Sequence, residues 1–323
     1  MIGVDVVVPN YNYAAYLRAC VESILNQEDV AVRVLIIDNA STDDSPAIAR
    51  SLAKDPRVTL VLREENRGTH ASFNEGIDWA QSEYFLLMFS DDFLVPGALK
   101  RAVDILEADR SLAFCYGRDV PLRNDQPIPD VPPQPSPTPY RVHSGGDFIS
   151  RFCRLGVFQI AGPSIVVRTE IQKRVGHYRT SLPHSDDYEI WLRLAMHGSV
   201  AELDCIQAGI RTHGANRSTE LWAHQALHIK HTAAAAESFF DHEGRLLKNG
   251  ERMRRMARRG IAHRAYWSGV SNLLRRDAEA LKLFQLAFSI APQTAVLPPL
   301  GYLLRRPDTW RRVRHLCGGT TRA

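Results

Sequence analysis

The sequence predicts an α/β fold with a mixed, mostly parallel central sheet flanked by helices. Apolar runs at residues 4–8, 32–37 and 58–62 are predicted strands, and segments of helical periodicity separate them. Strands that alternate with helices form a largely parallel sheet covered on both faces. Polar or acidic residues follow several of these strands, so we expect a ligand site at the carboxyl edge of the sheet.

The other elements are predicted from the same periodicities. Helices are expected at 13–26, 41–53, 72–80, 96–109, 146–154 and 187–197, and strands at 84–89 and 164–167. Eight of the 18 prolines lie between Pro121 and Pro139, which excludes a helix or a central strand and favours an extended surface loop. Beyond residue 220 the pattern is almost all helical, so a helical C-terminal region completes the fold.

Charge divides the chain into an acidic body and a basic tail. From Arg245 onward there are 17 Lys and Arg against four Asp and Glu, and the preceding residues hold 23 against 32. Such a tail fits an anionic partner, with a solvated helical face as an equally weighted alternative. The basic segments 252–259 and 310–315, beside apolar residues 297–304, favour a peripheral hold on an anionic membrane surface. No recognised nucleic-acid module accompanies the arginines, so nucleic acid is not an expected partner.

Cysteine spacing and hydropathy bear on the compartment. The five cysteines are scattered, without C-x-x-C spacing, which indicates reduced thiols. No signal peptide is expected, because no basic segment followed by an apolar run opens the chain. No uncharged apolar run approaches the ~18 to 20 residues that span a bilayer. The expected location is the cytoplasm, with a peripheral position on the inner face of the cytoplasmic membrane as an option.

An acidic pair ends the most apolar predicted strand. Asp91 and Asp92 follow the run FLLMF, where two carboxylates are costly unless they meet water or a cation. Carboxylate oxygens at a sheet edge suit Mg²⁺ or Mn²⁺ shared with substrate phosphates. A turn with a helix cap before Pro96 is the structural alternative.

Two further strand ends carry polar groups. Asp38 and Asn39 follow the second strand, where a carboxylate can accept a hydrogen bond from a base N–H, although both residue types are also common in turns. Arg67 follows the third strand and could meet a diphosphate, since a planar guanidinium suits phosphate oxygens. Asn74, two turns later, could face the same cleft. An ordinary surface arginine is the alternative for Arg67.

Six ordered runs of sequence form a pattern that is specific as a set, although each is weak alone. They are VDVVVPNYNYAAYLRACVESILNQ, VLIIDNASTDDS, NRGTHASFNEGIDWA, YFLLMFSDDFLVPGAL, SDDYEIWLRLAMHG and RTHGANRS. Together they resemble the family 2 glycosyltransferases with a GT-A fold, of the inverting type that builds bacterial cell-surface polysaccharides. The resemblance covers residues 1–218.

The resemblance implies roles for individual residues. Asp92 would bind the metal, although Phe89 stands where the commoner motif has an acid. The late His213 would approach the metal or the diphosphate. Asp187, at the start of a predicted helix, would be the catalytic base, with helix capping by Asp186 or Asp187 as the structural alternative. The nucleotide-sugar site would contain Pro9, Tyr11, Asn12, Asp38, Asn39, Arg67, Asn74 and Asp91.

The expected protein is therefore a metal-dependent, inverting hexosyltransferase. It would use Mn²⁺ or Mg²⁺ and a nucleotide diphosphate sugar, UDP- in preference to dTDP- or GDP-linked, to glycosylate a glycan or lipid-linked acceptor in polysaccharide or glycolipid biosynthesis at the cell envelope. Residues 1–118 would form the nucleotide-binding half and 119–218 the acceptor half of one GT-A domain, followed by a basic helical region at 219–323.

Two other classes compete with this reading. A dinucleotide-binding oxidoreductase would carry G-x-G-x-x-G after the first strand, where Pro9-Asn10-Tyr11-Asn12 stands instead. A non-catalytic nucleotide-sugar-binding or scaffold protein on the same fold would be expected to lack the base or the metal acid, and both are present.

Overall fold

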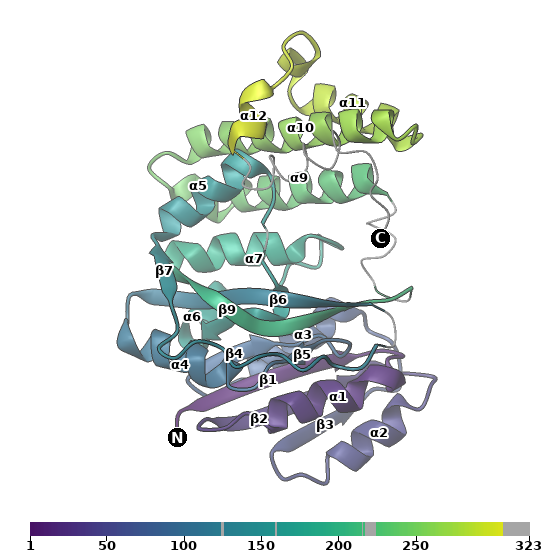
Figure 1. Cartoon of the computed structure of the whole chain (residues 1–323), viewed down its shortest axis with the longest axis vertical. Helices are drawn as coiled ribbons and strands as arrows, with labels where there is room; N and C mark the ends of the chain where they lie inside the picture. Colours follow the sequence, from purple (N-terminus) through teal and green to yellow (C-terminus); the bar gives the residue numbers. More distant parts are fainter. Residues whose placement is uncertain (124–125, 159, 215, 217–223, 306–323) are drawn as a thin grey trace. The chain divides into compact units, whose positions relative to one another are not determined.

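The computed structural model describes residues 1–123, 126–158, 160–214, 216 and 224–305 (Figure 1). The predicted basic segment at 310–315 lies outside these residues. The chain divides into two compact units. Unit 1 comprises Met1–Phe148, Gln159–Ser181 and Ile190–Thr219, and unit 2 comprises Ile149–Phe158, Leu182–Glu189 and Glu220–Ala323.

Unit 1 is built on a mixed sheet that has nine strands within the described residues, in the order β3-β2-β1-β4-β8-β6-β9-β5, with β7 paired to β9 (Figure 1). The pairs among β1 to β4 and the pair β6–β9 are parallel and contain most of the paired residues, whereas β8, β5 and β7 pair antiparallel. The predicted sheet is confirmed. Its strands are β1 (Gly3–Asn10), β2 (Ala31–Asp38), β3 (Val58–Leu62), β4 (Tyr84–Leu87), β5 (Phe93–Leu94), β6 (Leu112–Arg123), β7 (Tyr140–His143), β8 (Val166–Arg168) and β9 (Ser199–Thr212).

Helices cover both faces of this sheet. The alternation of β1 sends Val4, Val6 and Val8 into one core cluster with buried side chains of α1 and α4, while Val7 meets Gly76 of α3 on the other face. Helices α5 and α7 each have residues in both units. The helices are α1 (Ala14–Leu25), α2 (Ser45–Leu52), α3 (Thr69–Trp79), α4 (Ala98–Ala108), α5 (Gly145–Leu155), α6 (Thr169–Val175) and α7 (Asp186–Leu194), with short 3₁₀ turns at Gly162–Ser164 and Ala195–His197.

Four strands, β5, β6, β7 and β9, were not predicted. Strand β6 includes Pro121, inside the segment that was predicted to be an irregular loop. Strand β8 pairs with β6 only at Phe114 and Cys115, so at Pro121 strand β6 pairs with β9 alone. A proline, which has no backbone N–H to donate, is tolerated where one side of a strand is unpaired. Strand β9 was not predicted, because polar residues such as Glu202 and Gln207 interrupt its apolar pattern.

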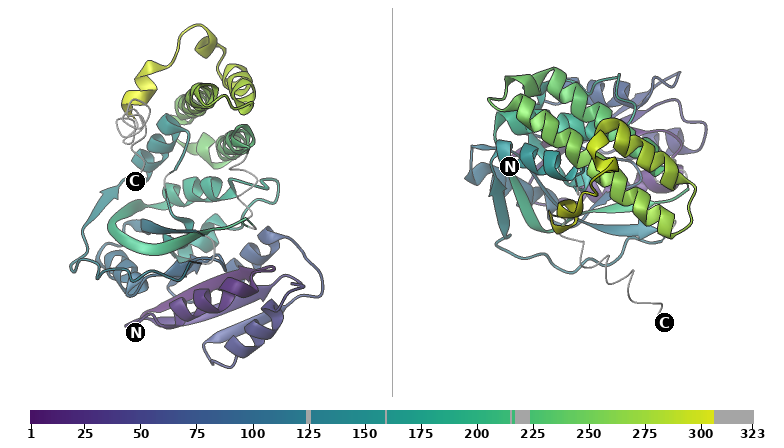
Figure 2. Two further views of the ribbon diagram at one scale, coloured as in Figure 1. Left: turned by 45° about the vertical axis from the view of Figure 1, so that its right-hand side comes forward. Right: turned by 90° about the horizontal axis from the view of Figure 1, so that it is seen from above.

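Unit 2 contains the predicted helical C-terminal region. Its helices are α9 (Gln225–Asp241), α10 (Gly250–Leu274), α11 (Glu279–Ile290) and α12 (Leu300–Arg305), with 3₁₀ turns at Glu243–Leu246 and Pro292–Ala295. Helices α10 and α11 run side by side (Figure 2). Glu237 of α9 accepts hydrogen bonds from Arg254 and Arg258 of α10. None of the helices in the described ranges has the length and apolar character needed to cross a membrane.

We predict that Gly209→Ala weakens the packing of β9 against β5. Gly209 lies opposite Phe93 in that pair, and a Cβ at position 209 would overlap the phenyl ring. Overpacking of this kind costs about 1–3 kcal/mol, so thermal unfolding should occur at a lower temperature than in the wild type. Gly214→Ala is the matched control, because a Cβ there has no neighbour within 4 Å. Equal melting temperatures for the two variants would show that the Phe93 ring moves aside at no cost.

Candidate functional site

The carboxyl ends of β1 and β2 meet at one buried hydrogen bond. Asn10 and Asp38 are partners in the parallel register, and Asn10 Nδ2 donates to Asp38 Oδ2 at 2.8 Å. The amide N–H of Ser41 donates to the other carboxylate oxygen at 3.0 Å. The Asp38 carboxylate is therefore fixed in direction at the sheet edge. Asn10 was not singled out from the sequence, and its role becomes visible only through the strand register.

The loops after these two strands share backbone strain and hydrogen bonds. Asn12 has φ 59° and Ala40 has φ 62°, in the left-handed region that costs a non-glycine residue about 1 kcal/mol or more. The N–H of Asn12 donates to Ser41 Oγ at 2.9 Å, and the N–H of Thr42 donates to Asn12 Oδ1 at 2.8 Å. Strained backbone held by such contacts is typical of ligand sites. Pro9 lies within β1, and the Tyr11 side chain is exposed.

Asn39 organises the loop that carries Arg67. Its Oδ1 accepts hydrogen bonds from Arg63 Nη1 at 2.9 Å and from the N–H of Arg67 at 3.0 Å. Arg63 Nη2 also donates to Glu75 Oε2 of α3 at 2.5 Å, so this hydrogen-bond network connects the loop to α3. The Arg67 side chain is exposed next to Gly68, which has φ 80°. Arg63 is a positioning residue that the sequence motifs did not identify.

Asn74 serves as a tie within unit 1. Its Nδ2 donates to the carbonyl oxygen of Tyr178 at 3.1 Å, and its Oδ1 accepts from the N–H of Tyr178 at 2.8 Å. Both ends of the amide are therefore occupied by backbone groups. Its expected contact with a nucleotide stays a prediction.

The acidic pair Asp91–Asp92 lies between β4 and β5 and is almost fully buried. The backbone N–H of Arg211 donates to Asp92 Oδ1 at 2.9 Å, and Asn216 Nδ2 donates to Asp91 Oδ2 at 2.6 Å. Burial raises the pKa of Asp91, and burial together with the Asp91 charge raises the pKa of Asp92 well above its usual value. Arg211 and Asn216 are further residues that sequence reasoning missed as contacts of this pair.

Strand β9 brings His213 to the acidic pair. Because β9 pairs with β5, the residues after its end reach Asp91, and His213 Nε2 lies 3.3 Å from Asp91 Oδ2. The imidazole packs against Tyr16 at 4.6 Å and Tyr13 at 5.4 Å between ring centroids. Tyr13, which contacts His213, directly follows Asn12 in the loop after β1. The loops after β1 and β2 and the acidic pair therefore border the same region of unit 1.

Phe89 belongs to an aromatic cluster where the commoner motif has an acid. Its ring centroid lies 6.1 Å from that of Phe73, which in turn packs at 5.0 Å against Tyr178. A carboxylate among these rings would lose its hydration without a compensating donor. The departure from the common motif therefore matches the local surroundings.

Asp187 lies in unit 2, in the first turn of α7. Asp186 beside it is buried with 4% exposure, whereas Asp187 is partly exposed. Ser185 precedes them with φ 58°, a third strained residue beside a predicted site residue. Tyr188 packs against Phe152 and Phe158 with centroid separations of 5.9 and 5.6 Å, which fixes the first turn of the helix.

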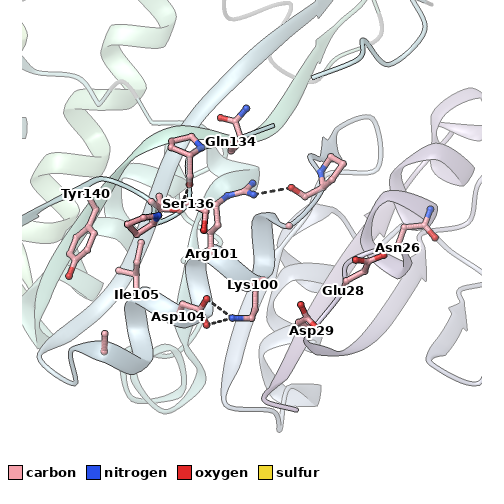
Figure 3. Close-up of a pocket in the computed structure, with 16 residues that line it drawn as sticks. Asn26, Glu28, Asp29, Lys100, Arg101, Asp104, Ile105, Gln134, Ser136 and Tyr140 are labelled. Carbon is pink, nitrogen blue, oxygen red and sulfur yellow. Dashed lines mark hydrogen bonds and ion pairs between the residues drawn. The ribbon is translucent and has the colours of Figure 1, made fainter. Parts of the chain in front are cut away.

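A separate pocket of about 670 Å³ lies toward the amino edge of β2 (Figure 3). Its walls are the turn after α1, including Asn26 and Asp29, one face of α4, and the proline-rich segment around Gln134. Figure 3 shows Lys100 and Asp104 of α4 paired within it, at 2.5 Å. The predicted site residues do not line this pocket. It is therefore distinct from the carboxyl-edge site.

A comparison with protein families matches residues 5–160 to the family Glycosyl transferase family 2. This part of the chain is similar to glycosyl transferase family 2. Among curated relatives, the succinoglycan biosynthesis protein ExoO of Rhizobium meliloti is 36% identical over 105 residues, 32% of this chain and 30% of ExoO. The alignments with the first curated relatives span a third or less of those proteins.

Solved structures extend the likeness from the family 2 segment to the fold of the whole chain. S. aureus TarS 1–349 in complex with UDP-GlcNAc has a TM-score of 0.66 at 16% identity, covering 99% of this chain and 93% of TarS 1–349. The mannosyltransferase PcManGT from Pyrobaculum calidifontis, in complex with GDP-Man and Mn²⁺, has a TM-score of 0.53 at 18% identity, covering 98% and 88%. The fold is of the GT-A type, as the motifs predicted.

The carboxyl-edge site offers a donor set that suits a hard divalent cation. Asp91 and Asp92 supply carboxylate oxygens, and His213 supplies an imidazole nitrogen beside Asp91. The described residues contain no group of three or more His, Cys, Asp or Glu side chains arranged around one metal position. Mg²⁺ and Mn²⁺ sites that use one or two carboxylates plus substrate phosphates need no such group. These residues therefore fit a cation that is shared with a diphosphate.

We predict that Asn10→Ala destabilises the family 2 segment by about 1–3 kcal/mol, because the buried Asp38 carboxylate loses a donor. Urea unfolding of Asn10→Ala, Asp38→Ala and the double variant would measure the coupling. The cost of Asn10→Ala should shrink clearly in the Asp38→Ala background. Additive costs would mean that this hydrogen bond does not hold Asp38.

Proposed function

We propose that the chain is a metal-dependent, inverting glycosyltransferase that moves a hexosyl group from a nucleotide diphosphate sugar to an acceptor hydroxyl. The observation that carries the proposal is the pair of fixed acidic positions at one sheet edge of the family 2 segment. Asp38 is held by Asn10 and Ser41. Asp92 is held by Arg211 near the end of β9, and Asp91 by Asn216, which follows β9. Separate acidic positions suit a ligand with a base at one end and a diphosphate at the other.

The donor would bind along the loops after β1, β2 and β3. Asp38 would accept a hydrogen bond from a base N–H, with Pro9, Tyr11 and Asn39 around the base, and the exposed Arg67 would meet the diphosphate. TarS in complex with UDP-GlcNAc and PcManGT in complex with GDP-Man support a nucleotide-sugar donor. UDP is our preferred nucleotide, with dTDP and GDP as alternatives. Asn12, Asn74 and Asp91 are the remaining proposed donor-site residues.

Asp92 and His213 would hold Mn²⁺ or Mg²⁺, with Asp91 near the ribose. When bound, the cation would neutralise the charge that grows on the departing diphosphate. The presence of Mn²⁺ with PcManGT supports a divalent metal. The Asp91 and Asp92 carboxylates are buried and have little contact with water, which favours a cation held tightly between the protein and the donor.

Asp187 would act as the general base. The acceptor oxygen attacks the anomeric carbon from the face opposite the diphosphate, the carbon–diphosphate bond breaks, and the hydroxyl proton passes to the Asp187 carboxylate. This single displacement inverts the anomeric centre without a covalent enzyme intermediate. Asp187 is preferred over Asp186 because Asp186 is almost fully buried, and a base must reach the acceptor.

We further propose a division of labour along the chain. Residues 1–118 would bind the nucleotide, 119–218 would face the acceptor, and 219–323 would form a basic helical region with a different task. The relationship to ExoO, a succinoglycan biosynthesis protein, supports a role in polysaccharide or glycolipid biosynthesis. The acceptor would be a glycan or a lipid-linked sugar. We place the enzyme in the cytoplasm, with a peripheral position at the inner face of the cytoplasmic membrane.

A binding protein without activity is the second candidate, and donor turnover separates the two. Purified protein with Mn²⁺ or Mg²⁺ should slowly hydrolyse one class among UDP-, dTDP- and GDP-sugars, because water can replace the acceptor. Tight nucleotide binding with no turnover of any donor, with or without added glycan acceptors, would favour the binding protein.

We predict that Asp187→Asn lowers the transfer rate by about 10²–10⁴-fold and leaves nucleotide binding unchanged, because only the proton acceptor is lost. Transfer of a radiolabelled sugar and calorimetric titration with UDP measure the two effects. Asp204→Asn is the control, since Asp204 is a surface carboxylate with 67% side-chain exposure. Wild-type turnover by the Asp187 variant would remove Asp187 from the mechanism.

Asp92→Asn should abolish the metal-dependent part of nucleotide binding, because a neutral amide is a weaker ligand for a hard cation. UDP affinity is measured once with Mn²⁺ and once with EDTA. In the variant the two values should converge on the wild-type value in EDTA. Thermal unfolding without metal verifies that the variant is folded. If Mn²⁺ still strengthened UDP binding as in the wild type, the metal would have to bind elsewhere.

A further inference from the structure

Unit 2 exposes large apolar side chains to an extent that unit 1 does not. Apart from Met1, every large apolar side chain in the described residues with more than 60% exposure lies between Leu246 and Leu304. Four of them are concentrated near the end of the described chain. They are Val296 at 81%, Leu297 at 74%, Leu300 at 65% and Leu304 at 78% exposure. Contiguous exposed apolar groups of this kind mark a surface that binds a partner.

The segment 296–304 is held firmly although its leucines are exposed. Trp267 of α10 donates its indole N–H to the carbonyl oxygen of Pro299 at 3.0 Å. Tyr302 is buried with 1% exposure, donates its hydroxyl to the carbonyl oxygen of Leu155 at 2.8 Å, and packs against His263. Tyr302 therefore anchors α12, and Leu300 and Leu304 face away from the unit. The apolar surface is built into the fold.

A row of arginines continues the same surface along α10. Arg252, Arg255 and Arg259 are exposed, and their spacing places them on the helix face that also carries His263 and Trp267. On the adjoining side of α10, Arg254 and Arg258 are paired with Glu237. Among the residues that the structure describes, the three arginines of the row form no ion pair.

We propose that this surface docks unit 2 onto an anionic lipid bilayer. It is defined as the basic row Arg252, Arg255 and Arg259 together with the leucine ridge Val296, Leu297, Leu300 and Leu304. The ridge would enter the boundary between headgroups and acyl chains, while the basic row would bind anionic headgroups, as in a peripheral membrane protein. Docking does not depend on catalysis, so it can be tested independently of the proposed transferase activity.

The charge pattern favours a bilayer over a second copy of the chain as the occupant. A two-fold contact through the leucine ridge would bring two basic rows close together, and like charges across an interface are unfavourable. From Arg245 to the end, Lys and Arg outnumber Asp and Glu by 17 to four, which adds long-range attraction to an anionic surface.

Vesicle co-sedimentation of the full-length chain tests the proposal. We expect binding to vesicles of 70% phosphatidylcholine and 30% phosphatidylglycerol at low salt, and much weaker binding to phosphatidylcholine alone. The triple variant Arg252→Gln, Arg255→Gln, Arg259→Gln should lower the affinity on the order of 100-fold, at roughly fivefold for each arginine. The pair Leu297→Ser, Leu300→Ser should lower it at least about tenfold, because two leucines no longer insert.

Matched controls are available in unit 1, where Val142 is 48% exposed and the Arg110 side chain is 75% exposed. Val142→Ser and Arg110→Gln should bind vesicles like the wild type, and all variants should bind UDP alike. Equal vesicle binding by the wild type and both surface variants would overturn the proposal. So would a change of oligomeric state in the leucine variant without a change in vesicle binding, which would identify the ridge as a contact between copies.

Discussion

The pairing of β5 with β9 is the constraint on which the acidic site depends. Strand β5 has only two residues, Phe93 and Leu94, and its partner Gly209 leaves just enough room for the Phe93 ring. This short ladder places the end of β9, which also pairs with β6, beside the acidic pair. Because of it, Arg211 donates to Asp92 and Asn216 donates to Asp91, across more than a hundred residues of sequence. The site is thus assembled by the sheet and does not arise from one local motif.

The two acidic positions are buried in different electrostatic surroundings. Asp38 receives a neutral amide donor on each oxygen, so its orientation is fixed before any ligand arrives. Asp91 and Asp92 lie side by side in a poorly hydrated place, with raised pKa values. One position is suited to recognising a neutral donor group, and the other to a cation. This difference supports the assignment of base recognition to the first and metal binding to the second.

Local sequence was sufficient to predict strands β1, β2 and β3, and insufficient to predict the strands and contacts that complete the carboxyl edge of the sheet. The strands β1, β2 and β3 are short, mostly apolar runs, so their ends could be located and the polar residues beyond them identified. Strand β9, which pairs with three other strands, mixes polar and apolar residues and was therefore not predicted. Local sequence also could not identify four residues that hold the site, because their partners depend on strand register and on pairing between distant segments. These residues are Asn10, Arg63, Arg211 and Asn216.

The anchoring of α12 by Tyr302 and Trp267 has a consequence for how fast a membrane could be engaged. An amphipathic segment that folds on a bilayer gives up conformational entropy at the moment of binding. Here the backbone of 296–304 is already ordered by its contacts with Leu155 and α10, so little entropy remains to be lost. Encounter would then be governed by electrostatic attraction to the arginine row, and residence time by the leucines. Added salt would therefore lower the rate of association with the membrane more than it raises the rate of dissociation.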